Sequence, residues 1–149
     1  MADLTTTIQE TVTINGSLRG STNSITTSNI NDVSERIVTC TSSVLTTIAV
    51  FAALPSTSPG ALDVDRTKYV RVTNLDPTVS VRLSVVGTAS MYTVLLTPGN
   101  SHILSNGAGV ILGQEATLPS IAALEDLASL QIKPVTAFDA RVELFVGVE

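Results

Sequence analysis

The sequence of 149 residues predicts an all-β protein: an antiparallel β-sandwich, for which a jelly roll is one possible form, with an extended N-terminal arm and at most one short helix. Roughly eight or more short segments alternate apolar and polar side chains, as strands with one buried face do. Turn signals separate them at intervals near the ~8–12 residues that are typical of sandwiches and barrels. The strand–helix–strand spacing of a parallel sheet is not found.

The composition supports the same class. Hydrophobic residues make up 44% of the chain, but aromatic residues only 3% and charged residues only 14%. The core must therefore consist of Val, Ile, Leu and Ala, and the charged fraction is well below the usual ~25%. Ser, Thr and Asn take the place of charges. Such a surface suits β structure and surfaces that other chains cover, because low charge removes repulsion that keeps proteins monomeric.

Residues 1–34 are predicted to form an extended N-terminal arm or peripheral strands, and residues 35–149 the body of the sandwich. The first region is rich in Thr, Ser and Asn, and its isolated apolar residues cannot bury much surface on their own. An alternating segment at 11–14 meets Asn15-Gly16, a strong signal for a tight turn. The region either docks locally, is disordered, or is an arm that becomes ordered on a neighbouring subunit.

In the body, alternation and β-branched runs predict several strands before and after the central segment 69–85. They lie at residues 36–41, 44–52, 91–97, 101–105, 110–112, 128–133 and 140–148. Residues 55–60, which include two prolines and a glycine, predict a loop. A short helix competes with a loop at residues 117–127, where Ser120 could cap a helix whose apolar residues share one face.

The clearest segment is 69–85, which predicts a β-hairpin. Both halves alternate strictly, and Asn74 and Asp76 between them can hydrogen-bond their own backbone while Pro77 presets φ for a turn. Matching the two apolar faces gives a definite register with a four-residue loop, 75–78. That register places Val72 opposite Val81 and Val70 opposite Leu83.

The outer face of this predicted hairpin places Arg71 opposite Arg82. Like charges directly opposite each other destabilise a sheet. Either the two side chains splay into solvent, or a partner surface or an acidic neighbour neutralises them. We therefore take Arg71 and Arg82 as candidate partner contacts, together with Thr11, Thr13 and Ile14 of the arm.

The residues that usually carry chemistry do not form a recognisable site, and we predict no enzyme activity, metal or cofactor. Cys40 is the only cysteine and is expected to act as a small buried hydrophobe. His102 is the only histidine, and no cysteine or second histidine can join it. Asp63 and Asp65 could begin a calcium loop, but the glycine and the closing glutamate of an EF-hand are absent. The sequence therefore predicts no small-molecule substrate.

Charge and hydropathy exclude two classes of partner. The net charge is −5, whereas nucleic-acid binding requires a basic surface that replaces counterions. The longest apolar stretch, 48–54, is much shorter than the ~20 residues of a membrane span, and we see no signal peptide. We therefore expect a protein that is made in the cytoplasm and binds neither nucleic acid nor membrane.

Four stretches carry a resemblance to a known family. They are residues 71–78 (RVTNLDPT), 96–104 (LTPGNSHIL), 11–20 and 30–33. With these motifs the chain resembles small β-rich virion proteins of tailed bacteriophages, particularly those that infect cyanobacteria and other aquatic hosts. The motifs are structural turns, so the resemblance implies a structural component and brings no catalytic residues with it.

The resemblance implies that the chain decorates or cements the phage capsid. The expected partners are the major capsid protein and copies of the chain itself, with a homotrimer favoured, and the expected location is the capsid surface of the virion. The first alternative is a neck, tail or fibre component, although the missing coiled-coil or repeat region argues against a fibre. The second alternative is a carbohydrate-binding module for host recognition.

Overall fold

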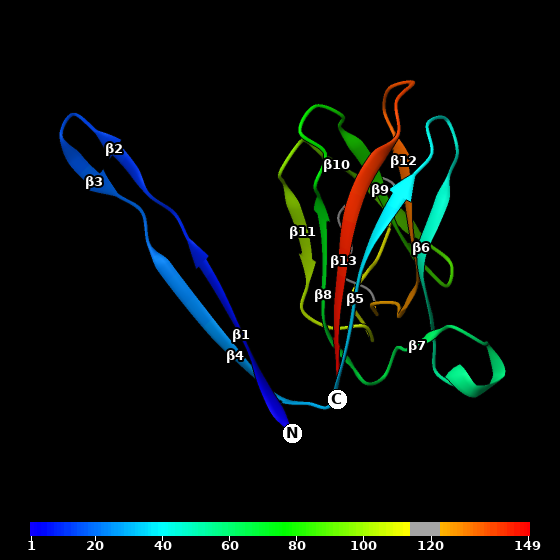
Figure 1. Ribbon diagram of the computed structural model, residues 1–149. Coiled ribbons are helices and arrows are strands. Elements are labelled where there is room, and N and C mark those ends of the chain that lie inside the picture. The colour runs from blue at the N-terminus through cyan, green and yellow to red at the C-terminus, as the bar shows by residue number, and fades with distance from the viewer. Residues whose placement is uncertain (114–122) are drawn as a thin grey trace.

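The computed structural model describes residues 1–113 and 123–149 and consists almost entirely of β-strands (Figure 1). Strands make up 61% of the described residues and helical residues 2%. The helical part is a 3-10 turn, Pro55–Thr57, inside the predicted proline-rich loop. Antiparallel sheets pack together, which confirms the predicted all-β sandwich.

Two sheets form the sandwich. The five-stranded sheet has the order β10 (Met91–Leu96), β9 (Val81–Gly87), β12 (Leu127–Pro134), β6 (Thr46–Ala52) and β7 (Leu62–Asp63). The four-stranded sheet has the order β11 (Ser101–Leu104), β8 (Thr67–Asn74), β13 (Ala140–Val148) and β5 (Asp32–Cys40). Without the two-residue β7, each sheet has four strands, and the chain crosses repeatedly between the sheets. This strand order is that of a jelly roll.

The core lies between the two sheets and consists of branched aliphatic side chains. Each strand contributes every second residue, as the period of two requires. The side chains that are at most 1% exposed include Val70, Val72, Val81, Leu83, Val85, Leu130, Ile132, Val142, Leu144 and Val146. The predicted final strand, with its alternating apolar face, is therefore confirmed as β13.

The predicted hairpin at 69–85 is wrong in its pairing. β8 pairs with β11 and β13, whereas β9 pairs with β10 and β12, so the two strands lie in opposite sheets. Val72 lies opposite His102 of β11 and Leu144 of β13. Val70 lies opposite Leu104 and Val146, and Arg71 lies opposite Ile103 and Phe145. Alternation shows which face of a strand is buried, but strands that pack across a sandwich have the same pattern as strands that pair side by side.

The turn chemistry predicted for this segment is nevertheless present, in the connection between β8 and β9. The Asn74 side chain is fully buried, and its amide donates to the carbonyls of Val79 (2.8 Å) and Leu96 (3.0 Å). Its Oδ1 accepts the N–H of Asp76. The Asp76 carboxylate accepts the N–H groups of Thr78 and Val79, and these bonds lower the pKa of Asp76. Asn74 thus ties the crossing loop to both sheets.

Most other predicted strands are confirmed, with boundaries shifted by a few residues. The strand predicted at 110–112 is reduced to a single bridge between Ile111 and Glu125. Of the possible helix at 117–127, residues 114–122 lie outside the described residues. Residues 123–126 are not helical, and Leu127 begins β12 with only 2% of its surface exposed. The helical spacing of a few apolar residues is therefore misleading here.

The first 30 residues form one long two-stranded arm (Figure 1). Strand β1 (Ala2–Gln9) pairs with β4 (Thr22–Ile30), and β2 (Val12–Ile14) pairs with β3 (Ser17–Arg19). Asn15 and Gly16 form the turn at its end with φ angles of 50° and 75°, as the predicted tight turn requires. Because β5 begins at Asp32, the predicted boundary at 34 falls inside a strand of the sandwich.

Polar side chains connect the two sheets along both open edges of the sandwich. At the edge formed by β10 and β11, the hydroxyl of Tyr92 lies 2.9 Å from Nε2 of His102. At the edge formed by β5 and β6, the guanidinium of Arg36 donates to the carbonyl of Ile48. His102 is therefore a strand residue, as predicted, and it holds the edges of the two sheets together.

Candidate functional site

The root of the arm packs on the outer face of the four-stranded sheet. Ile30 and Leu4 lie against Gly147: a Cβ built at this position would be 3.4 Å from Ile30 Cδ1 and 3.6 Å from Leu4 Cδ2, which are ordinary van der Waals distances. Ile30 is only 5% exposed, and the N–H of Asn31 donates to the carbonyl of Val148. The arm is thus anchored at its root by packing and by backbone hydrogen bonding.

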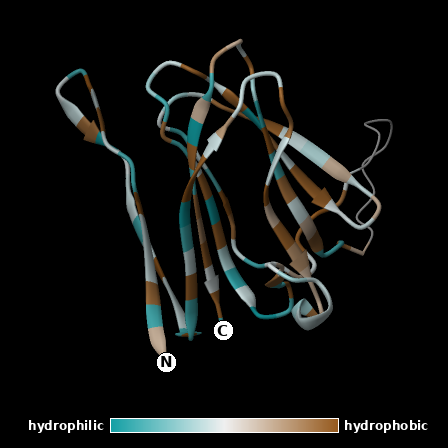
Figure 2. Cartoon of the chain, turned by 45° about the vertical axis from the view of Figure 1, so that its right-hand side comes forward, coloured by the Kyte–Doolittle hydropathy of each residue, from teal (hydrophilic) through white to brown (hydrophobic). Residues whose placement is uncertain are grey.

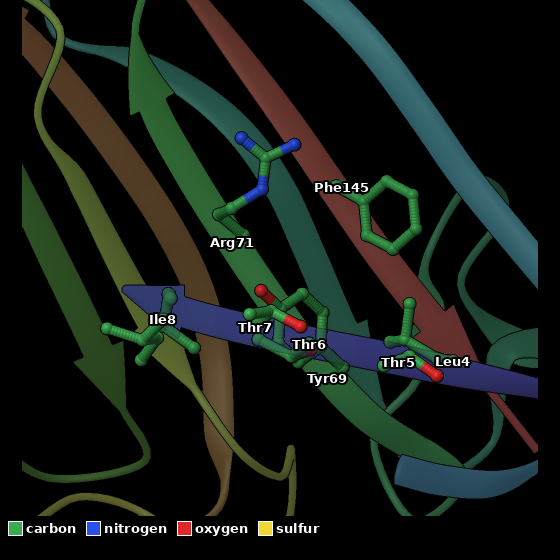
Figure 3. A pocket seen from close by; sticks show the side chains of 9 residues that line it. Leu4, Thr5, Thr6, Thr7, Ile8, Tyr69, Arg71 and Phe145 are labelled. Atoms are coloured by element: carbon green, nitrogen blue, oxygen red, sulfur yellow. The ribbon is translucent and has the colours of Figure 1, made fainter. Parts of the chain in front are cut away.

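Beyond the root, the arm diverges from the sandwich in both views (Figures 1 and 2). The space between the arm and the sheet is a groove of about 320 Å³, over which β1 crosses β8 and β13 (Figure 3). We call it the arm groove. Its lining comprises Leu4, Thr5, Thr6, Thr7 and Ile8 from the arm and Tyr69, Arg71, Ile103 and Phe145 from the sheet.

The polar part of the arm groove is a chain of side chains on the sheet. Arg71 forms an ion pair with Glu143 on the neighbouring strand and donates to the hydroxyl of Thr73. The Thr73 hydroxyl lies 2.7 Å from that of Ser101. Both charged side chains are mostly covered, at 28% and 18% exposure. Of the two alternatives for Arg71, an acidic neighbour within its own sheet is the one observed.

Aromatic rings extend this arrangement. The Arg71 guanidinium carbon lies 5.9 Å from the centroid of the Phe145 ring, within range of a cation–π interaction. Phe145 in turn makes an edge-to-face contact with Tyr69, with ring centroids 5.9 Å apart and planes at 78°. The floor of the groove is therefore preorganised by contacts within the sheet.

A second, apolar part of the groove of about 150 Å³ lies between the arm and strands β8 and β11. Its apolar lining residues include Ile8 and Ile25 of the arm and Ile103 of β11. These three side chains are 51%, 60% and 39% exposed. Lys68 also lines this part, but its ammonium group is 3.1 Å from the carboxylate of Glu149. The open surface is thus aliphatic, and its nearby charge is paired.

The arm itself is amphipathic. The face toward the sheet carries Leu4, Thr6, Ile8 and Ile25, because these positions share one side of the β1–β4 ladder. The opposite face carries hydroxyls, and those of Thr7 and Ser24 lie 2.9 Å apart. At the far end of the arm, Val12, Ile14 and Leu18 are 50%, 55% and 71% exposed. We call these three residues of β2 and β3 the arm tip.

The candidate contact residues do not come together in one place. Arg71 lies in the arm groove, whereas Arg82 lies exposed on β9 of the other sheet, opposite Leu95 and Lys133. Thr11, Thr13 and Ile14 are exposed at the end of the arm. Their contact with a partner remains a prediction. The like-charge pairing expected for Arg82 does occur, but with Lys133 rather than Arg71.

Sequence reasoning missed Glu143, Phe145, Ile8, Ile25 and Ile103 as parts of this surface. Glu143 and Phe145 could have been found, because they alternate with the buried residues of β13 and must therefore face outward. Their contact with Arg71 depends on the pairing of β8 with β13, which the local pattern does not reveal.

The remaining reactive side chains serve the fold. Cys40 is fully buried, and burial raises the pKa of its thiol to about 11, so that little reactive thiolate forms near neutral pH. The Asp63 carboxylate accepts the N–H groups of Asp65 and Arg66, as in a turn. Within residues 1–113 and 123–149, no cluster of His, Cys, Asp or Glu could hold a metal ion. The absence of enzyme activity remains a prediction.

Comparison of the sequence with protein-family models and with curated proteins finds no match. Among the residues that the structure describes, there is no helix with the length and apolar character that a membrane span needs. The geometry of the arm and its groove is therefore the basis for the functional proposal.

Proposed function

We propose that this chain is a structural protein of a tailed-phage virion that decorates and stabilises the capsid. Its partners in this role are the major capsid protein and further copies of the chain. The observation that carries the proposal is the arm, a two-stranded hairpin that exposes apolar side chains and diverges from its own sandwich. The resemblance of the turn motifs to phage virion proteins supplies the biological setting.

The energetics of the arm support a partner. A two-stranded hairpin by itself is marginally stable in water. Five aliphatic residues of this arm, Ile8, Val12, Ile14, Leu18 and Ile25, are 50–71% exposed. Full burial of such a side chain is worth about 1.5–3 kcal/mol, so covering the exposed halves of five would contribute on the order of 5 kcal/mol. That gain is available only to a binding partner that reaches the arm.

The sandwich suits the same role. A jelly roll is a packed body of two sheets that occurs in viral capsid proteins and also in lectins. The charged fraction of 14% leaves a surface of hydroxyl and aliphatic groups, which other chains can cover at little cost in desolvated charge. The lectin alternative usually relies on exposed aromatic rings. Among the described aromatic residues, Phe138 stands out at 71% exposure, while Phe51 and Tyr69 are buried.

The copy number of the chain in purified phage particles tests the proposal. Quantitative mass spectrometry against the major capsid protein should find on the order of hundreds of copies per particle, as the repeated sites of a symmetric shell require. About a dozen copies or fewer would contradict capsid decoration and favour the neck or tail alternative. Binding of the purified chain to assembled shells, but not to unassembled capsid subunits, is the second expected result.

A further inference from the structure

We propose that Asn15, in the turn at the end of the arm, is a site of spontaneous deamidation, whereas the fold protects Asn106. These are the two asparagines of the chain that glycine follows. Glycine has no Cβ to hinder attack of its backbone nitrogen on the side chain before it, so these two positions are the ones to compare. The inference is independent of the proposed function.

The reaction needs only water and hydroxide. Hydroxide removes the proton from the backbone nitrogen of Gly16, and that nitrogen attacks Cγ of Asn15. The new N–Cγ bond closes a five-membered succinimide ring, the Cγ–Nδ2 bond breaks, and ammonia leaves after it takes a proton from water. Water then adds to either ring carbonyl, and the ring opens to aspartate or isoaspartate. The net reaction consumes one water and releases one ammonia, without oxidation or reduction.

The end of the arm leaves Asn15 open to this reaction. Every residue from 11 to 20 is exposed, and no described atom outside its chain neighbours lies within 4 Å of where a Cβ of Gly16 would stand. Ring closure requires a backbone rotation at Asn15, so the turn must open first. Strands β2 and β3 pair over only three residues each, all of them exposed. Because so short a hairpin is marginally stable, it opens at low free energy.

Asn106 lies in the connection after β11, where hydrogen bonds hold the groups that would react. The N–H of Gly107, which would supply the attacking nitrogen, donates to the carbonyl of Thr67 at 3.0 Å. The carbonyl of Gly107 accepts the N–H of Leu127 at 2.9 Å, and Gly107 is buried. The side-chain amide of Asn106 donates to the carbonyl of Ala108 at 3.0 Å. Deamidation here requires the contacts with β8 and β12 to break, so part of the sandwich must open.

The two products change the arm in different ways. Either product replaces a neutral amide with a carboxylate, so the net charge changes from −5 to −6. Aspartate followed by glycine suits the same tight turn. Isoaspartate carries the main chain through the side chain and adds a methylene to the turn, so the pairing of Ile14 with Ser17 cannot be kept. One product therefore retains the hairpin that carries the arm tip, and the other unpairs it.

Peptide mapping of the folded full-length chain tests the inference. The chain is incubated in water labelled with heavy oxygen and digested in ordinary water, so that the label marks only asparagines that reacted before digestion. Cleavage after Arg19 releases residues 1–19, in which Asn15 is the single asparagine. Asn15 is expected to react at least about tenfold faster than Asn106, because the end of the arm opens at a lower free energy. Its rate should also rise about tenfold for each pH unit near neutrality, as the fraction of deprotonated nitrogen does.

Two controls separate the effect of the fold from that of the local sequence. In guanidinium chloride the chain is unfolded, and the rates at Asn15 and Asn106 should become similar, because nothing then protects Asn106. The variant Asn15→Gly removes the reacting amide and keeps a pair of residues, Gly-Gly, that suits a tight hairpin turn. Residues 1–19 of this variant should take up no label under the same conditions.

Two results would overturn the inference. One is equal rates at Asn15 and Asn106 in the folded chain. The other is an Asn15 rate in the folded chain about tenfold or more below its rate in denaturant, since the turn would then be held closed. Neither result bears on capsid decoration, which the copy number in particles decides. Conversely, a copy number of about a dozen would contradict capsid decoration and leave the difference between the two asparagines unchanged.

Discussion

The arm and the sandwich use similar strand-forming residues but differ in what covers them. In the sandwich, each strand turns its aliphatic side chains toward the opposite sheet, and side chains such as Leu83 and Leu144 are completely buried. In the arm, Ile8 and Ile25 have no second layer over them and are more than half exposed. Alternation alone thus makes a strand, but a second layer is needed to make a core.

This difference has an energetic meaning. The stability of the sandwich comes from apolar surface that is removed from water within one chain. The arm has its backbone ladder and the packing of Leu4 and Ile30 at its root, but its outer half lacks that contribution. We expect the arm to open locally at a much lower free energy than the sandwich. The predictions below test this contrast.

The largest expected effect is on the core. Leu144→Ala should lower the free energy of unfolding by about 2–5 kcal/mol, because the substitution removes a fully buried side chain and leaves a cavity. Ile25→Ala, at a 60% exposed position of the arm, should change it by less than about 0.5 kcal/mol. Urea denaturation of the isolated chain measures both. Equal losses would mean that the arm is packed as tightly as the core.

An intermediate effect is expected at the crossing loop between the sheets. Asn74→Ala should cost about 1–3 kcal/mol, because it leaves the buried carbonyls of Val79 and Leu96 without their donor. The matched control is Asn100→Ala, whose amide reaches only the exposed hydroxyl of Thr97. A small loss at Asn74 would show that water replaces its amide in this connection.

The smallest expected effect is a pH dependence from His102. Burial lowers the pKa of His102. The imidazole of the unfolded chain therefore takes up a proton near pH 6.5, whereas the imidazole of the folded chain stays neutral until a lower pH is reached. Stability should therefore decrease as the pH falls below about 6.5 and level off once the folded imidazole is protonated. His102→Gln should flatten the profile between pH 7.5 and 5, measured by thermal unfolding. A wild-type profile that is already flat would contradict a buried, neutral His102.

Most of the strands could be predicted from local patterns, and their pairing could not. The segment 69–85 illustrates the limit: the alternation, Asn74 and Asp76 were all identified correctly, yet β8 and β9 lie in opposite sheets. The buried face of each strand is the same whether it pairs with its sequence neighbour or packs across from it. The pairing of β8 with β13 joins residues that are 68 to 81 positions apart in the chain, and no local signal encodes that contact.

The candidate site was predictable in its parts only. Thr11, Thr13 and Ile14 were placed on an arm, and Arg71 on an outer face, from composition and alternation. The groove exists because Leu4 and Ile30 pack over Gly147 at the root, after which the arm diverges. That packing joins the arm to a residue at the far end of the chain, so the sequence pattern of the arm does not reveal it.

By itself, the sequence determined the class of the protein: an all-β chain with an aliphatic core, little charge, a polar N-terminal arm and turns at Asn15-Gly16 and Asn74–Asp76. These properties follow from backbone preferences and from the period of two, which act over a few residues. Only the tertiary structure decided the jelly-roll order, the neutralisation of Arg71 by Glu143 and the groove beneath the arm. These features depend on packing between strands that are distant in the sequence, and the whole chain must fold before they exist.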